Sequence, residues 1–474
     1  MAENGIIPTV MCGGSGSRLW PLSRAQLPKP FVELPAGGTL LQQTFAGLAG
    51  LAPEKVIAIC AAEHQANVRA IFRLSGLAAE LVVIAEPLAR NTAPAAAVAA
   101  RFALERFGAD ATLALLPADH VVKDRPEFCR ALVRAAAAAG SQRLAVLGIR
   151  PDSPSDQYGY IKAGTKGSEE WCEVASFIEK PDLQNAQKMI AAGGHYWNAG
   201  VFVARADVLS QEFVAHAPPI ADIAAALEVP VSGDWSPDAK SYAAFPNISI
   251  DYAVAEKTTR AALVADVDAG WSDVGDWHSF AQLIPNAGGS NRATTGSSQF
   301  VSCTNCASFS TTDRTIAVIG LEKAVVVDTA DALLVLGPQA AAQAGAIYRQ
   351  LVDAGDLAAL SPPYEQRPWG RYWVLASGPG FKLKRVEVNP GARLSLQSHD
   401  RRSEHWTVVT GTMSATVGDK MFDMKVEESC HVPRQSKHRL ANCTDKPAAV
   451  IELQLGDYLG EDDIRRYEDD YQRP

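Results

Sequence analysis

The spacing of hydrophobic residues changes once along the chain, and this change constrains the fold more than any other feature. Up to about residue 280, short apolar runs such as 6–12 alternate with Ala- and Leu-rich stretches of helical spacing such as 93–107. Strands separated by helices form βαβ units, so we predict a mostly parallel sheet covered by helices. After residue 366 the apolar residues recur at every second position, as in 381–388, which predicts a compact all-β domain.

The segment between these two patterns predicts a third part. Residues 286–298 are rich in Gly, Asn, Ser and Thr, which is typical of a linker. Short β-type runs follow, and then a stretch of helical spacing at 340–354. We therefore predict an α/β domain over 1–285, a small β-rich extension with a closing helix over 286–356, and the all-β domain over 357–474. We also expect the charged segment 460–471 to be helical.

Composition and charge narrow the class of protein. Of 474 residues, 47% are hydrophobic and 20% are charged, which is typical of a soluble globular chain. The net charge of −9 argues against a nucleic-acid partner, and no apolar run approaches the ~20 residues of a membrane span. Eight scattered cysteines and no signal peptide favour reduced thiols, so we expect a cytoplasmic protein without a membrane partner.

A glycine-rich loop after the first predicted strand is the first candidate site. Gly13, Gly14 and Gly16 allow the backbone to approach an anion closely, with N–H groups facing it. Arg18 follows in the next predicted helix, and Lys29 lies between two prolines. A stiff loop that presents the cation Lys29 suits a triphosphate, and Arg18 adds a charge-assisted contact. The spacing fits neither the dinucleotide fingerprint nor the P-loop.

The longer pattern resembles the signature of sugar-1-phosphate nucleotidyltransferases. The glycines run through Arg18-Leu-Trp-Pro-Leu-Ser-Arg to Pro28-Lys29-Pro30, and this version resembles the mannose-1-phosphate guanylyltransferase branch. The resemblance covers about residues 5–355 and implies a Rossmann-like, GT-A-like nucleotidyltransferase domain with a short β-helix-like extension. Further segments that match in the family's order are 86–94, 116–120, 158–161, 177–181, 197–200 and 271–275.

This resemblance implies a reaction and a role for each matching residue. GMP would pass from GTP to mannose 1-phosphate, giving GDP-mannose and pyrophosphate. Asp119 and Asp273 would hold Mg²⁺, which prefers a few carboxylates together with substrate phosphate. Arg18 and Lys29 would hold the triphosphate, and Lys180 would meet the phosphate of mannose 1-phosphate. The other implied substrate-binding residues are Arg90 and Asn91 beside the nucleoside, and Gly159, Glu179 and Asn198 beside the sugar.

A second candidate site lies in the all-β part, which holds four of the nine histidines. Gln397 and His399 share one face of a predicted strand, because residues i and i+2 do so. Glu404 lies near the start of the next strand, and His438 follows later. These residues can close on one divalent metal, and mixed nitrogen and oxygen ligands suit Zn²⁺, Mn²⁺ or Co²⁺.

This spacing resembles the two motifs of the cupin fold. The segments around 367–370, 402–406 and 458–466 resemble type II phosphomannose isomerase, across about residues 360–474. The resemblance implies interconversion of mannose 6-phosphate and fructose 6-phosphate with Zn²⁺ or another divalent metal. Lys384 is a candidate base or phosphate ligand, and Arg402 and Arg465 are candidate phosphate-binding cations.

Two alternatives remain open. The sequence departs from the isomerase pattern at Arg401, where the family often has His, and at Gln435, where a turn Gly is expected. The first alternative is therefore a guanylyltransferase whose cupin serves only structure or dimerisation. Separately, we expect the chain to form a homo-oligomer, specifically a dimer. A non-catalytic sensor of sugar nucleotides is the second alternative, and the intact Lys29, Asp119 and Asp273 argue against it.

Overall fold

The computed structural model of the chain describes residues 5–14, 16–294, 297–338 and 340–470. Ser15 of the glycine-rich loop, residues 295–296 of the predicted linker and residue 471 of the predicted final helix lie outside these ranges. The chain divides into two compact units, Met1–Leu360 and Ser361–Pro474. Among the described residues, no helix is both long enough and apolar enough to cross a membrane.

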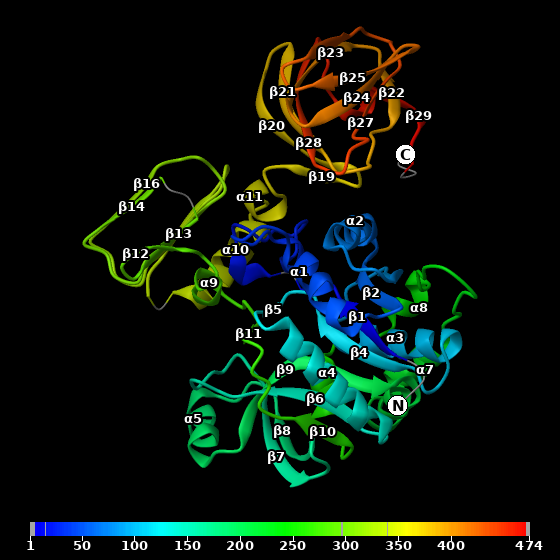
Figure 1. Cartoon of the computed structure of the whole chain (residues 1–474), viewed down its shortest axis with the longest axis vertical. Coiled ribbons are helices and arrows are strands. Elements are labelled where there is room, and N and C mark those ends of the chain that lie inside the picture. The colour runs from blue at the N-terminus through cyan, green and yellow to red at the C-terminus, as the bar shows by residue number, and fades with distance from the viewer. Residues whose placement is uncertain (1–4, 15, 295–296, 339, 471–474) are drawn as a thin grey trace. The chain divides into compact units, whose positions relative to one another are not determined.

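The first unit is built on a nine-stranded sheet (Figure 1). Strands β1–β4 are parallel to one another, and β10 is parallel to β6, whereas β9 runs antiparallel between β4 and β6. The sheet order is β3 (Glu80–Glu86), β2 (Lys55–Ala61), β1 (Ile6–Met11), β4 (Thr112–Pro117), β9 (His195–Arg205), β6 (Leu144–Ile149), β10 (Ala261–Val264), β8 (Cys172–Ile178) and β7 (Tyr160–Lys166).

Helices cover both faces of this sheet because its central strands are apolar on both sides. Leu113 and Leu115 pack with α3 (Thr92–Arg106), α6 (Ala206–His216) and α7 (Pro218–Ala226) in the largest core. Leu116, which alternates to the other face, lines a cavity beside α1 (Leu40–Gly47) and α4 (Arg125–Gly140). The helix expected at 93–107 is therefore confirmed as α3. The remaining helices of eight or more residues are α2 (Gln65–Ser75), α5 (Leu183–Ala192) and α10 (Ala344–Asp353).

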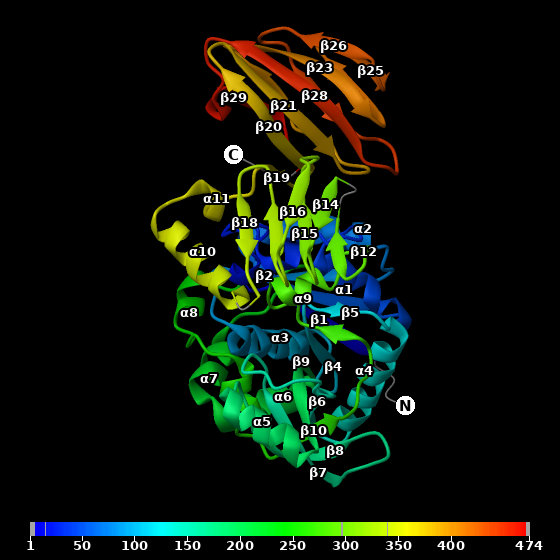
Figure 2. The same ribbon diagram turned by 90° about the vertical axis from the view of Figure 1, so that its left-hand side faces the viewer.

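The extension consists of short strands stacked in parallel coils (Figure 2). One sheet has the order β12 (Asn286–Gly288), β13 (Asn291–Ala293), β15 (Ala307–Ser310), β17 (Val325–Asp328) and β18 (Leu333–Leu336). A second sheet pairs β14 (Ser298–Val301) with β16 (Ile316–Ile319). The prediction of a linker over 286–298 is wrong, because β12, β13 and the start of β14 lie in this segment.

The extension shares a core with residues 16–30, which we call the signature loop, and with the helices that precede and follow the extension. Leu19 and Trp20 are buried with Val325 and Val327 of β17, with α9 (Trp277–Ala281) and with α10. The short α11 (Leu357–Leu360) ends this unit.

The second unit is all-β, as expected from the period of two, and forms a barrel of two sheets (Figure 1). One sheet has the order β19 (Glu365–Arg367), β20 (Gly370–Gly378), β21 (Phe381–Val388), β28 (Ala448–Gly456), β23 (Arg402–Thr410) and β26 (Ser429–Val432). The other has the order β25 (Lys420–Lys425), β24 (Thr412–Val417), β27 (His438–Ala441), β22 (Leu396–His399) and β29 (Ile464–Glu468).

The expected helix at 460–471 is wrong. The segment begins with one 3₁₀ turn, Glu461–Asp463, and continues as strand β29, which pairs with β22. Pairing with another strand satisfies the backbone groups of this charged segment, so tertiary contacts override its local composition.

Candidate active sites

Lys29 joins two aspartates that are far apart in the sequence. Its Nζ lies 2.9 Å from Oδ2 of Asp119 and donates a hydrogen bond to the backbone carbonyl of Asp273. Asp119 follows β4, and Asp273 follows the two-residue strand β11 (Trp271–Ser272). That strand pairs with β5 (Val121–Val122), just after Asp119, and this pairing brings the two loops together.

The charges in this cluster are set by burial and by neighbouring groups. Burial alone would raise the pKa of Asp119, but Lys29 and His120 outweigh it and hold this pKa below its ordinary value. Burial lowers the pKa of His120, whose Nδ1 accepts a hydrogen bond from Nε1 of Trp271 at 3.1 Å. Asp273 accepts a hydrogen bond from the Tyr158 hydroxyl at 2.8 Å. Asp119 is thus an anion beside a neutral imidazole at neutral pH.

The glycine-rich loop lies directly against Lys29. Gly16 has a φ of +62°, and a Cβ there would lie 2.5 Å from Cβ of Lys29. Gly14, with a φ of +109°, faces the Asp119 carboxylate, and a Cβ at Gly13 would meet nothing within 4 Å. The backbone at Gly13 is therefore open to a ligand, while Gly16 permits the close approach of the lysine. Arg18, at the end of the loop, donates to Gln157 at 2.7 Å.

Arg24, which the sequence analysis did not single out, connects the signature loop to the extension. Its side chain is fully buried and donates two hydrogen bonds to the Asp331 carboxylate, at 2.9 and 3.1 Å. A third donor, Nε, reaches the carbonyl of Pro21 at 2.6 Å. Because the partner is more than 300 residues away, no local pattern indicates this contact.

The signature loop also forms backbone hydrogen bonds with the end of the first unit. The backbone N–H of Ala25 donates to the carbonyl of Ala359 at 3.0 Å, and that of Gln26 donates to Leu360 at 2.9 Å. These bonds join the residues between Arg18 and Lys29 to α11.

A second cluster gathers the residues expected on the sugar side. A Cβ on Gly159 would lie 2.5 Å from Oε2 of Glu179, so this carboxylate lies directly against the backbone of Gly159. Lys180 donates to Glu179, and the amide of Asn198 donates to Asp251 at 2.9 Å. Burial and the charge of Glu179 raise the pKa of Asp251 to about 6. Asp251 was missed, because a single Asp in an apolar helical pattern is typical of a solvated surface.

Arg90 and Asn91 lie between β3 and α3. Their hydrogen-bond partners, Ala243 and Thr92, belong to neither of the two clusters described above. Arg90 donates to the carbonyl of Ala243 at 2.7 Å. Asn91 has a φ of +67°, and its side chain accepts a hydrogen bond from the backbone of Thr92 at the start of the helix.

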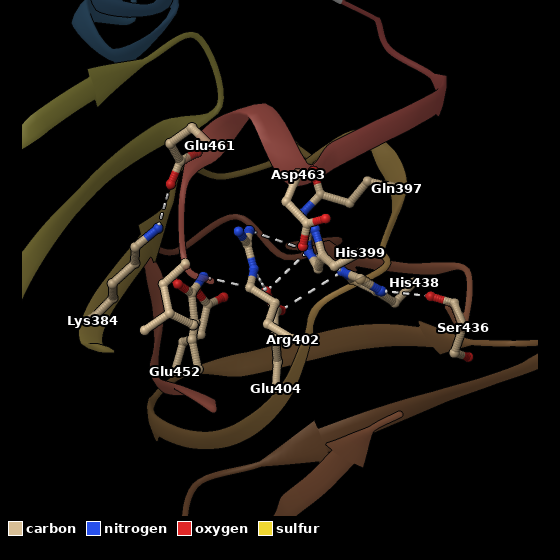
Figure 3. A network of polar contacts seen from close by, with 12 residues as sticks. Lys384, Gln397, His399, Arg402, Glu404, Ser436, His438, Glu452, Glu461 and Asp463 are labelled. Atoms are coloured by element: carbon tan, nitrogen blue, oxygen red, sulfur yellow. Dashed lines mark hydrogen bonds and ion pairs between the residues drawn. The ribbon is translucent and has the colours of Figure 1, made fainter. Parts of the chain in front are cut away.

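Inside the barrel of the second unit, two imidazoles and a carboxylate converge (Figure 3). His399 Nε2 lies 3.0 Å from Oε1 of Glu404 and 3.1 Å from Nε2 of His438. His438 Nε2 lies 3.7 Å from the other oxygen of Glu404. All three side chains are buried, and their ligand atoms lie within 4.8 Å of one another.

The surroundings of these three side chains fit a divalent metal. Nδ1 of His438 is 2.8 Å from the carbonyl of Ser436, which accepts its proton and leaves Nε2 as a lone-pair donor. Burial would raise the pKa of Glu404, but His399, His438 and Arg402 lower it well below its ordinary value. Burial lowers the pKa of His438. Two imidazole nitrogens and a carboxylate oxygen are ligands that Zn²⁺ and similar metals prefer.

The other residues expected at this site lie around a cavity of the same barrel. Gln397 lines this cavity and accepts a hydrogen bond from Ser395 at 2.9 Å. Arg402 is buried between Glu404 and the carbonyl of Gly460. Lys384 reaches Oε1 of Glu461 at 2.9 Å, and although burial opposes it, acidic neighbours raise the pKa of this lysine (Figure 3).

The structure brings Arg466, and not Arg465, to this cavity. Arg465 is exposed and lies over the ring of Tyr467, 5.7 Å from its centroid. In the strand β29, Ile464 and Arg466 share one face, and both line the cavity.

Two buried side chains of this cavity were missed by the sequence analysis, and both lie on β28. Glu452 and Gln454 point into the barrel, where Nε2 of Gln454 donates to Glu452 at 2.8 Å. Burial and the charge of Glu404 raise the pKa of Glu452 to about 7. The sequence does show Glu452 and Gln454 alternating with Ile451 and Leu453. This alternation alone matches no known motif, so it did not indicate a functional site.

Both parts of the chain match known protein families. Residues 7–288 match the family described as Nucleotidyl transferase, and residues 363–469 match Mannose-6-phosphate isomerase C-terminal. The chain is 40% identical to the alginate biosynthesis protein AlgA of Pseudomonas aeruginosa, over 99% of this chain and 97% of the relative. It is also 40% identical to the xanthan biosynthesis protein XanB of Xanthomonas campestris, over 99% of both chains.

Two further relatives carry names that refer to mannose 1-phosphate. The mannose-1-phosphate guanylyltransferase of Escherichia coli is 36% identical over 99% of this chain and its own full length. A crystal structure described as mannose-1-phosphate geranyltransferase from Thermus thermophilus is 31% identical, with a TM-score of 0.64. It covers 73% of this chain and 99% of that one. The chain thus has a guanylyltransferase and an isomerase domain, and it belongs to the bifunctional GDP-mannose pyrophosphorylase and phosphomannose isomerase family.

Proposed function

We propose that the first unit transfers GMP from GTP to mannose 1-phosphate, forming GDP-mannose and pyrophosphate. The observation that carries this proposal is the convergence of Lys29, Asp119 and Asp273 beside a glycine loop with an open backbone. The attacking oxygen belongs to a sugar phosphate, so the protein must chiefly position two anions and neutralise their charge. Lys29 and Arg18 supply the positive charge, and Gly13, Gly14 and Gly16 admit the triphosphate.

Asp119 and Asp273 are the residues that would hold Mg²⁺. A positively charged ammonium already lies between these two loops, so their donors suit a hard cation. When bound, Mg²⁺ supplies neutralisation of phosphate charge. The neutral state of His120 preserves the negative charge of the site, because a second cation there would compete with the metal.

The second cluster is proposed to bind the sugar phosphate. Lys180 is half exposed and would turn from Glu179 to the phosphate of mannose 1-phosphate. Glu179 and Asn198 offer a carboxylate and an amide to sugar hydroxyls, and Asp251 holds the amide of Asn198 in place. Arg90 and Asn91 would lie beside the nucleoside.

The second unit is proposed to interconvert mannose 6-phosphate and fructose 6-phosphate. His399, Glu404 and His438 would hold Zn²⁺ or another divalent metal, with Gln397 as a further candidate. When bound, such a metal polarises a carbonyl and stabilises the oxyanion that forms. Lys384 keeps its proton beside Glu461, which supports a role in binding the phosphate and not in removing a proton. Arg402 and Arg466 add positive charge.

The competing hypothesis keeps the transferase and gives the barrel only a structural role. The buried set His399, Glu404 and His438 argues against this hypothesis. Burying three polar side chains costs free energy, and a barrel with only a structural role would gain nothing from that cost. Arg401 and Gln435, where the sequence departs from the family pattern, are exposed residues, and the set stays together with both departures present.

Two assays on the full chain test these proposals together. Pyrophosphate release is measured with a panel of nucleoside triphosphates and sugar 1-phosphates, and we expect the highest turnover with GTP and mannose 1-phosphate. Formation of fructose 6-phosphate from mannose 6-phosphate is measured with each divalent metal after chelation. A wild-type protein that is inactive with every metal would remove the isomerase proposal and leave the transferase untouched.

A further inference from the structure

Aldose–ketose isomerisation needs a group that moves a proton between two carbon atoms, and the barrel cavity offers several titratable side chains. Among the described residues that line it, the carboxylates are Glu404, Glu452 and Glu461, and the one amine is Lys384. We propose that Glu452 is the catalytic base that carries this proton, an inference that rests on the isomerase activity proposed above.

The position of Glu452 in the sheet places it between the metal site and the phosphate-binding cation. On β28 it is paired with Lys384 of β21 on one side and with Trp406 of β23 on the other. Nε1 of Trp406 donates to Oε2 of Glu452 at 3.2 Å and also to Oε2 of Glu404 at 3.1 Å. Glu452 is therefore one strand away from a metal ligand and faces the same cavity.

The other two carboxylates of the cavity, and its amine, already have charged partners. Glu404 contacts His399 and Arg402, and Glu461 is paired with Lys384. Glu452, in contrast, has no ion pair within 4.0 Å in the described part of the chain. Its contacts are two neutral N–H donors, from Gln454 and Trp406, so its carboxylate keeps lone pairs for a proton.

The proton transfer balances with this one carboxylate. Glu452 accepts the proton from C2 of the open-chain aldose, and the electron pair of the C2–H bond forms the C1=C2 bond of an enediolate. The carbonyl oxygen at C1 becomes negative and gains the proton that the C2 hydroxyl loses. Glu452 then returns its proton to C1, and the C2 oxygen forms the new carbonyl. No oxidant or further reactant is needed.

The test compares Glu452→Gln and Glu452→Asp with wild type in the metal-loaded full chain. We expect Glu452→Gln to lower kcat of the isomerase by about 100- to 10,000-fold, the range for loss of a general base. Bound metal per chain, measured by mass spectrometry, and pyrophosphate release should stay at wild-type values. Glu452→Asp keeps the carboxylate on a shorter side chain and should recover part of the activity.

A direct readout of proton transfer separates a catalytic role from a structural one. In D₂O, the wild type should incorporate deuterium at the transferred position, followed by NMR, and Glu452→Gln should not. Formate should partly restore the activity of Glu452→Ala, because it returns a carboxylate to the vacated space. Glu387→Gln is the matched control, since Glu387 lies on the neighbouring strand and pairs with Arg371 outside the cavity.

Three outcomes would overturn the inference while the isomerase activity itself stands. The first is a Glu452→Gln enzyme within threefold of the wild-type kcat. The second is a loss of metal in proportion to the loss of activity, which would make Glu452 a support of Glu404. The third is an inactive Glu452→Asp enzyme together with no rescue of Glu452→Ala by formate. Wild-type protein without isomerase activity would instead refute the proposed function.

Discussion

Gly16→Ala should disable the transferase by displacing Lys29. The new Cβ would lie 2.5 Å from Cβ of Lys29, and 3.1 and 3.2 Å from its Cα and N atoms. Restoring an ordinary contact of 3.4 Å moves the lysine by about 0.9 Å, and because its backbone is also crowded, the side chain cannot simply rotate away. A misplacement of about 1 Å costs about 100-fold in rate, so kcat/KM for pyrophosphate release should fall about 100-fold.

The same substitution also strains the backbone, and a second glycine separates the two effects. Gly76 has a φ of +70°, close to the +62° of Gly16, but a Cβ there would meet nothing within 4 Å. Gly76→Ala should therefore lose about 1–2 kcal/mol of unfolding free energy from the left-handed conformation alone and keep full activity. Gly16→Ala should lose this amount and the activity. If Gly16→Ala stayed within threefold of wild type while Gly76→Ala was destabilised, the contact with Lys29 would not position the lysine for catalysis.

Four further outcomes follow from the two sites. Asp119→Asn should reduce pyrophosphate release below detection and leave isomerase activity intact; comparable losses in both assays would point to misfolding. Glu404→Gln should lower bound metal, measured by mass spectrometry, at least tenfold, because it removes the anionic member of the proposed ligand set. Burial raises the pKa of Asp251 from 3.8 to about 6, so the folded protein binds this proton more tightly and loses stability as pH rises through that range. At pH 8 the free energy of unfolding of Asp251→Asn should thus exceed that of wild type by up to about 3 kcal/mol, and this difference should disappear near pH 4. A difference that does not depend on pH would contradict this reasoning. Gln435 has a φ of +62°, so Gln435→Gly should stabilise the barrel by about 1 kcal/mol in thermal unfolding, whereas a lower melting temperature would show that the side chain is needed.

The patterns that predicted the fold were the local ones. The period of two after residue 366 and the alternation of strands and helices before residue 280 both follow from burial of one or two faces within a short window. The turn at Gln435 is a similar case, because a glycine was expected there and the residue present does adopt the left-handed conformation that favours glycine. Local burial and local backbone requirements are visible in a single sequence.

Features that depend on pairing across the chain could not be predicted. Residues 286–298 have the composition of a linker, yet β13 forms because it can pair with β15 in a neighbouring coil. The terminal segment has the composition of a charged helix and becomes β29. That one difference changes which arginine enters the cavity, since a strand presents every second residue, and it explains why Arg466 lies there instead of Arg465.

The candidate sites divide in the same way. Lys29, Asp119 and Glu404 stand in motifs with fixed spacing, and their neighbours in space were expected from the resemblance. Asp251 and Glu452 have no motif, because each becomes noteworthy only through burial next to another carboxylate. Such pairs require knowledge of which strands and loops meet.

The two hydrogen bonds from Ala25 and Gln26 to Ala359 and Leu360 indicate at which residue a fragment of the first unit should end. A fragment that stops at residue 356 would lack α11, and the backbone N–H groups of Ala25 and Gln26 would lose their acceptors. A fragment that stops at residue 360 retains both. Gene splitting, limited proteolysis and the transfer of this catalytic unit to another fusion should therefore place the break after Leu360, even though the helix α11 looks like the beginning of the connection to the barrel.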